Sequence, residues 1–127
     1  MKQIQLLAQP LGRLLLALMF VLSGFGKIGA YAGTQGYMEA MGVPGALLPL
    51  VIALELVGGL AIVVGWNTRI VAFLLAGFSV VAALLFHGNV DDQMQMILFM
   101  KNISVAGGFL LLVAHGAGAY SLDNRKA

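Results

Sequence analysis

The sequence has no cysteine and few charged residues. Because none of its 127 residues is Cys, disulfides, thiol redox chemistry and Cys-ligated iron–sulfur or zinc sites are excluded within this chain. Lys, Arg, Asp and Glu make up 9% of the residues, whereas a soluble domain has about 25%. With 61% apolar residues and a mean hydropathy of +0.97, the chain cannot cover its surface against water. We therefore expect lipid to be its solvent.

Two further patterns are missing. The net charge is only +2, and no cluster of Lys and Arg is present that could follow a phosphate backbone, so no nucleic-acid partner is expected. No stretch alternates polar and apolar residues with a period of two, which argues against a membrane β-barrel. The remaining membrane architecture is a bundle of helices.

Four apolar stretches are each near the length of about 20 residues that a helix needs to cross a bilayer. They cover residues 10–30, 46–65, 69–87 and 94–115. We therefore predict an all-α, integral membrane four-helix bundle that forms a single domain over residues 1–127. The glycine-rich segment between the first two helices is long enough to form a small cap.

The short connections carry helix-capping residues. The sequence GWNTR at 65–69 predicts a tight hairpin in which Asn67 or Thr68 caps the next helix, and either Asp91 or Asp92 is expected to cap the last one. Lys and Arg also predict the orientation, because cytoplasmic loops are enriched in them. With both termini in the cytoplasm, one basic residue, Lys27, lies outside, and five lie inside: Lys2, Arg13, Arg69, Arg125 and Lys126.

The stretch SGFGKIGAYAG at 23–33 admits three interpretations. Its G-x-G-x-x-G spacing matches a dinucleotide-binding turn, but no strand precedes it and no βαβ pattern follows. Cleavage of a signal peptide after Ala32 would leave only three helices, and Arg13 and Lys27 make the unit too long. We favour an uncleaved first helix, in which the glycines at 24, 26, 29 and 33 allow close helix packing. Gly26 with Ala30 and Gly29 with Gly33 have the spacing of small-residue pairs.

Ionisable residues within the predicted spans are the functional candidates, because a charge at the bilayer centre costs roughly 3 kcal/mol or more. Every predicted helix brings such a residue to the outer half of the bundle. We take Glu55, Lys101 and His87 as catalytic candidates. We expect the substrate to be bound by Lys27, Asn102, Glu55 and Lys101. Arg69 and Asp123 lie at the cytoplasmic surface, where an anchoring or pairing role is expected.

Glu55 needs a cationic partner. Gly58 and Gly59 follow it by three and four residues and leave space beside the carboxylate, so either Lys101 or Lys27 is its natural partner. The surplus lysine would favour an anion or an electron-rich acceptor, such as a quinone carbonyl or a phenolate. The structural alternatives are that Lys27 extends to the interface and that a Glu–Lys pair only fixes helix packing. No metal site and no intrinsic cofactor are expected.

Several motifs together resemble the DoxX family: GFGKIGAYAGTQGYMEAMGVP at 24–44, ALELVGG at 53–59, GWNTR at 65–69, FHG at 86–88, FMKN at 99–102 and GAGAYSLD at 116–123. The resemblance covers the chain from about Arg13 to Asp123 and is nearest to small YqjF-type members of the bacterial inner membrane. It implies a four-helix membrane fold in that membrane. The polar positions chosen above all fall within these motifs.

The resemblance also implies a function. The namesake of the family is the small membrane subunit of a thiosulfate:quinone oxidoreductase, and other members are linked to quinone and catechol detoxification. We therefore expect a quinone- or phenol-linked membrane redox component, with a membrane quinone as the ligand and a redox partner protein or a second copy of the chain as possible partners. Two alternatives stay open: a non-catalytic subunit that anchors or assembles a redox partner, and a small proton-coupled exporter.

Overall fold

The computed structural model describes residues 2–86, 91–118 and 121–123, and in these ranges the chain forms helices and no strands. The elements are α1 (Lys2–Gly29), α2 (Tyr31–Ala40), the 3₁₀ turn η1 (Gly45–Leu47), α3 (Leu48–Val64), α4 (Thr68–Phe86) and α5 (Gln93–His115). Four helical segments in the described part are long and apolar enough to cross a membrane: α1, η1 with α3, α4, and α5. The prediction of an all-α membrane four-helix bundle is confirmed.

The first helix and the connection after it differ from the predicted bounds. α1 begins at Lys2 and continues through Pro10, whereas the helix was expected to start at residue 10. Inside a helix, a proline removes one backbone hydrogen bond and crowds the carbonyl four residues before it. The helix nevertheless continues through Pro10, and good helix formers such as Gln and Leu precede it. The glycine-rich segment after α1 forms α2, separated from α1 only by Ala30. The other spans begin and end within two residues of the predicted positions.

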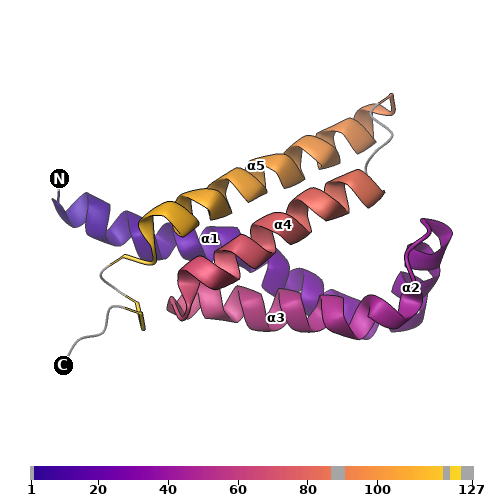
Figure 1. Cartoon of the computed structure of the whole chain (residues 1–127), viewed down its shortest axis with the longest axis horizontal. Coiled ribbons are helices and arrows are strands. Elements are labelled where there is room, and N and C mark those ends of the chain that lie inside the picture. The colour runs from indigo at the N-terminus through magenta and orange to yellow at the C-terminus, as the bar shows by residue number, and fades with distance from the viewer. Residues whose placement is uncertain (1, 87–90, 119–120, 124–127) are drawn as a thin grey trace.

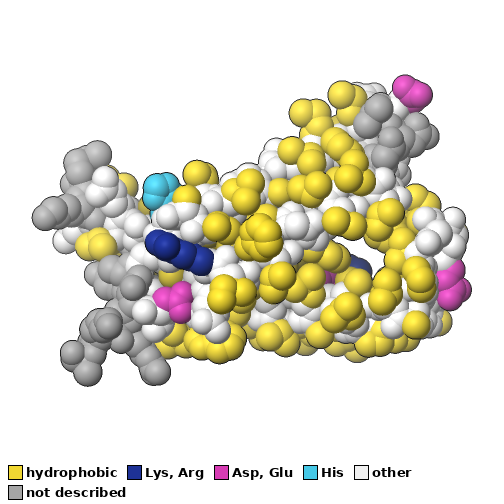
Figure 2. Space-filling view, in the orientation of Figure 1, with side chains coloured by type: hydrophobic (Ala, Val, Ile, Leu, Met, Phe, Trp, Pro, Cys, Tyr) yellow, Lys and Arg dark blue, Asp and Glu magenta, His cyan; other side chains and the backbone are white. Residues whose placement is uncertain are grey.

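The spanning helices pack as two pairs. α1 lies mainly against α3 and α4 mainly against α5, and the α3–α4 contact joins the pairs. Figure 1 shows the pairs meeting near the α3–α4 turn and diverging toward α2, which lies at the open end. The core fills the end where the pairs meet; its buried residues are Ala17, Phe20, Ile62, Ala72, Leu75, Ala76, Ala106 and Phe109. Figure 2 shows mostly apolar side chains along the middle of the molecule, as a lipid-facing surface requires.

Close helix packing uses one of the four expected glycines, Gly24, together with Gly59 of α3. A Cβ at Gly59 would lie 2.8 Å from Val21 of α1, and one at Gly24 would lie 2.7 Å from Leu56 of α3. Gly26, Gly29 and Gly33 have no neighbour within 4 Å at that position, so the expected pairing of these three was wrong. Gly59, together with Gly24, brings α1 and α3 together.

The α3–α4 turn is short, and the backbone N–H groups of residues 65–68 are all hydrogen-bonded. Gly65 has a φ of 75°, a left-handed conformation that glycine adopts without a steric penalty. The N–H of Trp66 donates to the carbonyl of Ala61 over 2.8 Å. Two further carbonyls at the end of α3 are bonded by the C-terminal segment. The N–H of Leu122 donates to the carbonyl of Val64, and that of Asp123 donates to the carbonyl of Gly65. The end of α3 is therefore bonded partly by residues distant in the sequence.

Arg13 completes the end of α3. Its side chain is 1% exposed, and its Nη1 donates to the carbonyls of Ile62 over 2.9 Å and Val63 over 2.8 Å. The last turn of a helix leaves carbonyls without intrahelical partners, and a guanidinium provides several donors in a fixed plane. Arg13 therefore fastens α1 to α3 inside the bundle.

Asp123 caps α4 from outside the spans. Its carboxylate accepts the N–H of Asn67 over 2.7 Å and that of Thr68 over 2.8 Å, in the place that Asn67 or Thr68 was expected to fill. Burial alone raises the pKa of Asp123, but the hydrogen bonds from Thr68 and Asn67 and the charge of Arg13 outweigh it and hold that pKa below its ordinary value of 3.8. At α5, Asp92 is the cap and accepts the N–H of Met94.

Replacing Arg13 by Met should destabilise the bundle by about 2 kcal/mol, because the carbonyl of Val63 would lose its bond from the guanidinium inside the protein. The measurement is the midpoint of thermal unfolding in detergent, followed by circular dichroism. Arg69→Met is the matched control, since Arg69 is exposed. Equal midpoints for the two variants would contradict the role assigned to Arg13.

The cap on α4 should make stability depend on pH. Folding lowers the pKa of Asp123. The stabilisation from its ionised carboxylate is therefore fully present when the pH is above the pKa of Asp123 in the unfolded chain, and it is lost as the pH falls through the pKa in the folded protein. Wild type should exceed Asp123→Asn in unfolding midpoint at neutral pH, and the gap should narrow below about pH 4. Asp91→Asn, at an exposed position, serves as the control. A gap that is constant down to about pH 2 would exclude the cap as its source.

Candidate functional site in the cavity between the helix pairs

The diverging helix pairs enclose a cavity of about 430 Å³. Its walls come from α1, α2, α3, α4 and α5, and most of the residues that line it are apolar. Figure 2 shows a hollow between apolar surfaces, with basic and acidic side-chain atoms visible inside it. Cavities of roughly 300–1,000 Å³ with a few polar groups in an apolar wall are typical of small-molecule sites.

The first polar group of the cavity is an ion pair between α1 and α3. Lys27 Nζ lies 2.9 Å from Glu55 Oε1, and the two side chains are 26% and 5% exposed. Ser23, one helical turn before Lys27, links the two: Lys27 Nζ donates to Ser23 Oγ over 2.6 Å, and Ser23 Oγ donates to Glu55 Oε2 over 3.2 Å. We call Ser23, Lys27 and Glu55 the charged cluster.

The spacing of the charged cluster follows from the helices. Residues four apart lie on one face of a helix, so Ser23 and Lys27 both face α3. Gly24, beside them, brings α3 close because its missing side chain makes room for Leu56. Glu55 precedes Leu56 and therefore meets the lysine at short range. A buried carboxylate needs both a counter-ion and hydrogen bonds, and the charged cluster provides both.

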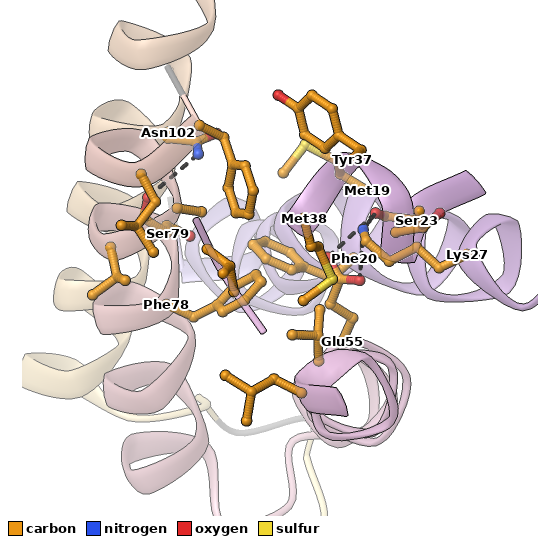
Figure 3. A pocket seen from close by; sticks show the side chains of 18 of the residues that line it. Met19, Phe20, Ser23, Lys27, Tyr37, Met38, Glu55, Phe78, Ser79 and Asn102 are labelled. Carbon is orange, nitrogen blue, oxygen red and sulfur yellow. Dashed lines mark hydrogen bonds and ion pairs between the residues drawn. The ribbon is translucent and has the colours of Figure 1, made fainter. Parts of the chain in front are cut away.

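The second polar group lies on α4 and α5. Asn102 Nδ2 donates to the backbone carbonyl of Ser79 over 3.3 Å, and both side chains are buried. The hydroxyl of Ser79 is buried and has no hydrogen-bond partner in the described part of the chain. Figure 3 shows Ser79 and Asn102 across the cavity from Lys27, Ser23 and Glu55. We call these two residues the Ser79–Asn102 pair.

Aromatic rings line the cavity between and above these groups. Phe20 and Phe78 meet edge to face with centroids 6.3 Å apart, and Figure 3 shows both between the charged cluster and the Ser79–Asn102 pair. Tyr37 of α2 stacks on Phe86 of α4 with centroids 5.4 Å apart and an interplanar angle of 22°. This stack joins α2 to the α4–α5 pair where the helices diverge.

The structure brings four of the predicted site residues to one cavity: Lys27, Glu55, Lys101 and Asn102. Of the two possible partners of Glu55, the ion pair is formed by Lys27. Lys101 is exposed and forms no ion pair with another described residue. His87 lies outside the described residues.

The remaining expectations concern other parts of the molecule. Arg69 and Asp123 line a separate polar depression near the chain termini, together with His115. Gly58 and Gly59 were expected to leave space beside the carboxylate of Glu55. Instead they face Leu75 and Val21, so the space beside them is used for helix packing. In the described ranges no three His, Asp or Glu side chains are grouped to hold a metal ion.

Three residues that matter here were not among the predicted site residues. Ser23 was placed on the helical face of Lys27, four residues before it, but was given no role in the site. Ser79 is an isolated hydroxyl in an apolar helix, but its missing hydrogen bond is visible only in three dimensions. Arg13 was counted as a charge at the membrane surface, and its burial against α3 depends on the rotation of α1.

These features define a small multi-pass helical membrane protein with a polar group inside an apolar cavity. The sequence pattern of the family described as DoxX matches residues 8–88, and the chain belongs to this family. It is 51% identical over 123 residues to "Inner membrane protein YqjF" of Escherichia coli (strain K12), with 97% of this chain and 95% of that protein covered.

Two further relatives extend the comparison. "Inner membrane protein YphA" of the same strain is 38% identical, with 91% of this chain and 87% of the relative covered. "Putative oxidoreductase CatD" of Bacillus subtilis (strain 168) is 26% identical over 78% of each chain. No solved structure matches the chain significantly. The relatives and the four apolar helices together indicate a multi-pass protein of the inner membrane.

The ion pair should show strong coupling in a double-mutant cycle. Lys27→Met and Glu55→Gln should each destabilise the bundle, because each leaves one partner without its counter-charge, while the double variant should be more stable than the sum predicts, by about 1 kcal/mol or more. The measurement is reversible unfolding of the four proteins in mixed detergent micelles. Strictly additive effects would contradict the pairing. Lys101→Met with Glu55→Gln is the control pair and should be additive within error.

Proposed function

We propose that the cavity binds the headgroup of a quinone or phenol and that the protein is a membrane redox component for quinone or oxidative-stress detoxification. The observation that carries this proposal is the charged cluster inside an apolar cavity between the spanning helices. A quinone has a flat apolar ring with oxygen acceptors and is dissolved in lipid. The apolar walls suit its ring, and Lys27 suits its oxygen.

The chemistry proposed for the charged cluster is electrostatic. Reduction of a quinone places negative charge on its oxygens, and an ammonium in a low-dielectric site stabilises such charge strongly. Lys27 is the donor in this proposal. Glu55 exchanges the proton, with Ser23 between the two side chains as the route. Each reduction of a quinone to a quinol takes up two electrons and two protons, and we assign the electrons to a redox partner protein.

Lys101 and Asn102 extend the site on the opposite wall. The ammonium of Lys101 gives the cavity a second positive charge, whereas Glu55 is its one acidic lining residue. This surplus favours an anionic phenolate or semiquinone over a cation. The role of His87 in proton exchange remains a prediction from the sequence.

Similarity gives limited support of its own. One relative is named as an oxidoreductase, at 26% identity, and the two relatives of higher identity are named only as inner membrane proteins. Among the described residues of the cavity, no contact favours the alternative of a non-catalytic subunit. The exporter alternative needs a carboxylate available to a cationic substrate, and Glu55 is already paired with Lys27.

Binding of a quinone to the purified protein in lipid nanodiscs tests the proposal. We expect saturable binding of 1,4-naphthoquinone, measured by equilibrium dialysis against empty nanodiscs, and a loss of affinity of about tenfold or more in Lys27→Met, because this variant lacks the ammonium that would bind the quinone oxygen. Glu39→Gln is the control, since Glu39 is exposed and does not line the cavity.

A host strain that lacks its own copy gives the second measurement. Cells producing the wild-type chain should tolerate added quinone better than cells producing Glu55→Gln with Lys101→Met. Folded wild-type protein that binds no quinone, together with equal tolerance of both strains, would overturn the proposal. Co-purification of a partner that is lost in these variants, without any quinone binding, would instead support the anchoring subunit.

A further inference from the structure

We infer that the cavity holds its ligand at two opposite ends, so that it selects a flat ring with an oxygen at each end, such as a 1,4-quinone or its hydroquinone. This inference rests on the proposed function and narrows it to one arrangement of oxygens. One end is the charged cluster on α1 and α3. The other is the Ser79–Asn102 pair on α4 and α5.

The hydroxyl of Ser79 is the observation that marks the second end. A serine inside a helix commonly donates to the carbonyl one turn earlier, but Ser79 Oγ makes no such bond and is buried. A buried hydroxyl without a partner is unfavourable, and Ser79 lines the cavity wall. It is therefore positioned to donate to an oxygen inside the cavity.

Asn102 supports the same end from α5. Its amide is held in place by the bond from Nδ2 to the carbonyl of Ser79, and its side chain also lines the cavity. Ser79 and Asn102 thus place a hydroxyl and a carboxamide together on one wall. These groups are neutral and suit a second carbonyl or hydroxyl of the ligand, whereas a second anionic group would be better matched by a charge.

The shape between the two ends selects the ligand further. Figure 3 shows Phe20 and Phe78 between the charged cluster and the Ser79–Asn102 pair. Aromatic edges and faces favour a flat ring. In a 1,4-quinone the two oxygens point in opposite directions and reach both ends at once. In a 1,2-quinone both oxygens point the same way and reach only one end.

The test compares isomers of equal size with wild-type protein in nanodiscs. Dialysis should show 1,4-naphthoquinone binding about tenfold more tightly than 1,2-naphthoquinone, as one added hydrogen bond allows. 1-Naphthol, with one oxygen, serves as the one-ended probe. Because the chain has no Cys, thiol addition to the quinones does not complicate the measurement.

Ser79→Ala should remove the preference for 1,4-naphthoquinone over 1,2-naphthoquinone. It should weaken the binding of 1,4-naphthoquinone about tenfold and leave the binding of 1-naphthol unchanged. Lys27→Met should weaken the binding of both 1,4-naphthoquinone and 1-naphthol. Ser104→Ala is the matched control, because Ser104 is exposed on α5 and does not line the cavity. The unfolding midpoint of Ser79→Ala should equal or exceed that of wild type, since the substitution removes a hydroxyl without a partner.

The outcomes separate the two proposals. The two-ended site would be overturned, while the proposed function stands, if wild-type protein bound the two naphthoquinone isomers equally. The same holds if Ser79→Ala lost as much affinity for 1-naphthol as for 1,4-naphthoquinone. Absence of binding of all three ligands to folded wild-type protein would overturn both.

Discussion

An ionised group inside a membrane protein needs polar partners within the protein, and the packing of α1 on α3 provides such partners at two places. At one, Lys27 lies 2.9 Å from Glu55. At the other, Arg13 donates to the last carbonyls of α3. Since lipid does not drive helices together by the hydrophobic effect, these polar contacts and the close approach at Gly24 and Gly59 determine how the two helices associate.

The way in which the two helix pairs are joined explains where the cavity lies. The helix pairs are joined at one end by the short α3–α4 turn, which the segment around Asp123 fastens. The core residues fill that end. At the other end the pairs diverge (Figure 1), and α2 spans the gap by stacking Tyr37 on Phe86. The polar residues on the two pairs therefore face each other across a space instead of packing directly.

Hydropathy was sufficient to predict the four spans, because each needs only a run of apolar residues of the right length. It also showed that Lys27, Glu55, Lys101 and Asn102 lie at a common depth, since depth follows from residue count along a helix. It could not choose between the two lysines, because that choice depends on how α1 and α5 are rotated toward α3. The cap on α4 comes from Asp123, 55 residues away, and no local pattern identifies it. The composition of α2 is typical of a loop, and its helix depends on the neighbours it contacts.

Under the proposed function the site receives charge, and a neutral ion pair is a stable resting state for such a site. In a cavity of low dielectric a charge needs an opposite charge close by, and Lys27 and Glu55 provide this for each other over 2.9 Å. In the proposed reaction, a ligand oxygen that becomes negative would compete with Glu55 for the ammonium. Ser23 accepts from Lys27 and donates to Glu55, so it would stay bonded to one of them if the pair separated. The charge that the ligand gains would then be met by a cation already present, with Glu55 released to exchange a proton. On this argument the structural role of the pair and its proposed chemical role are two consequences of the same contact.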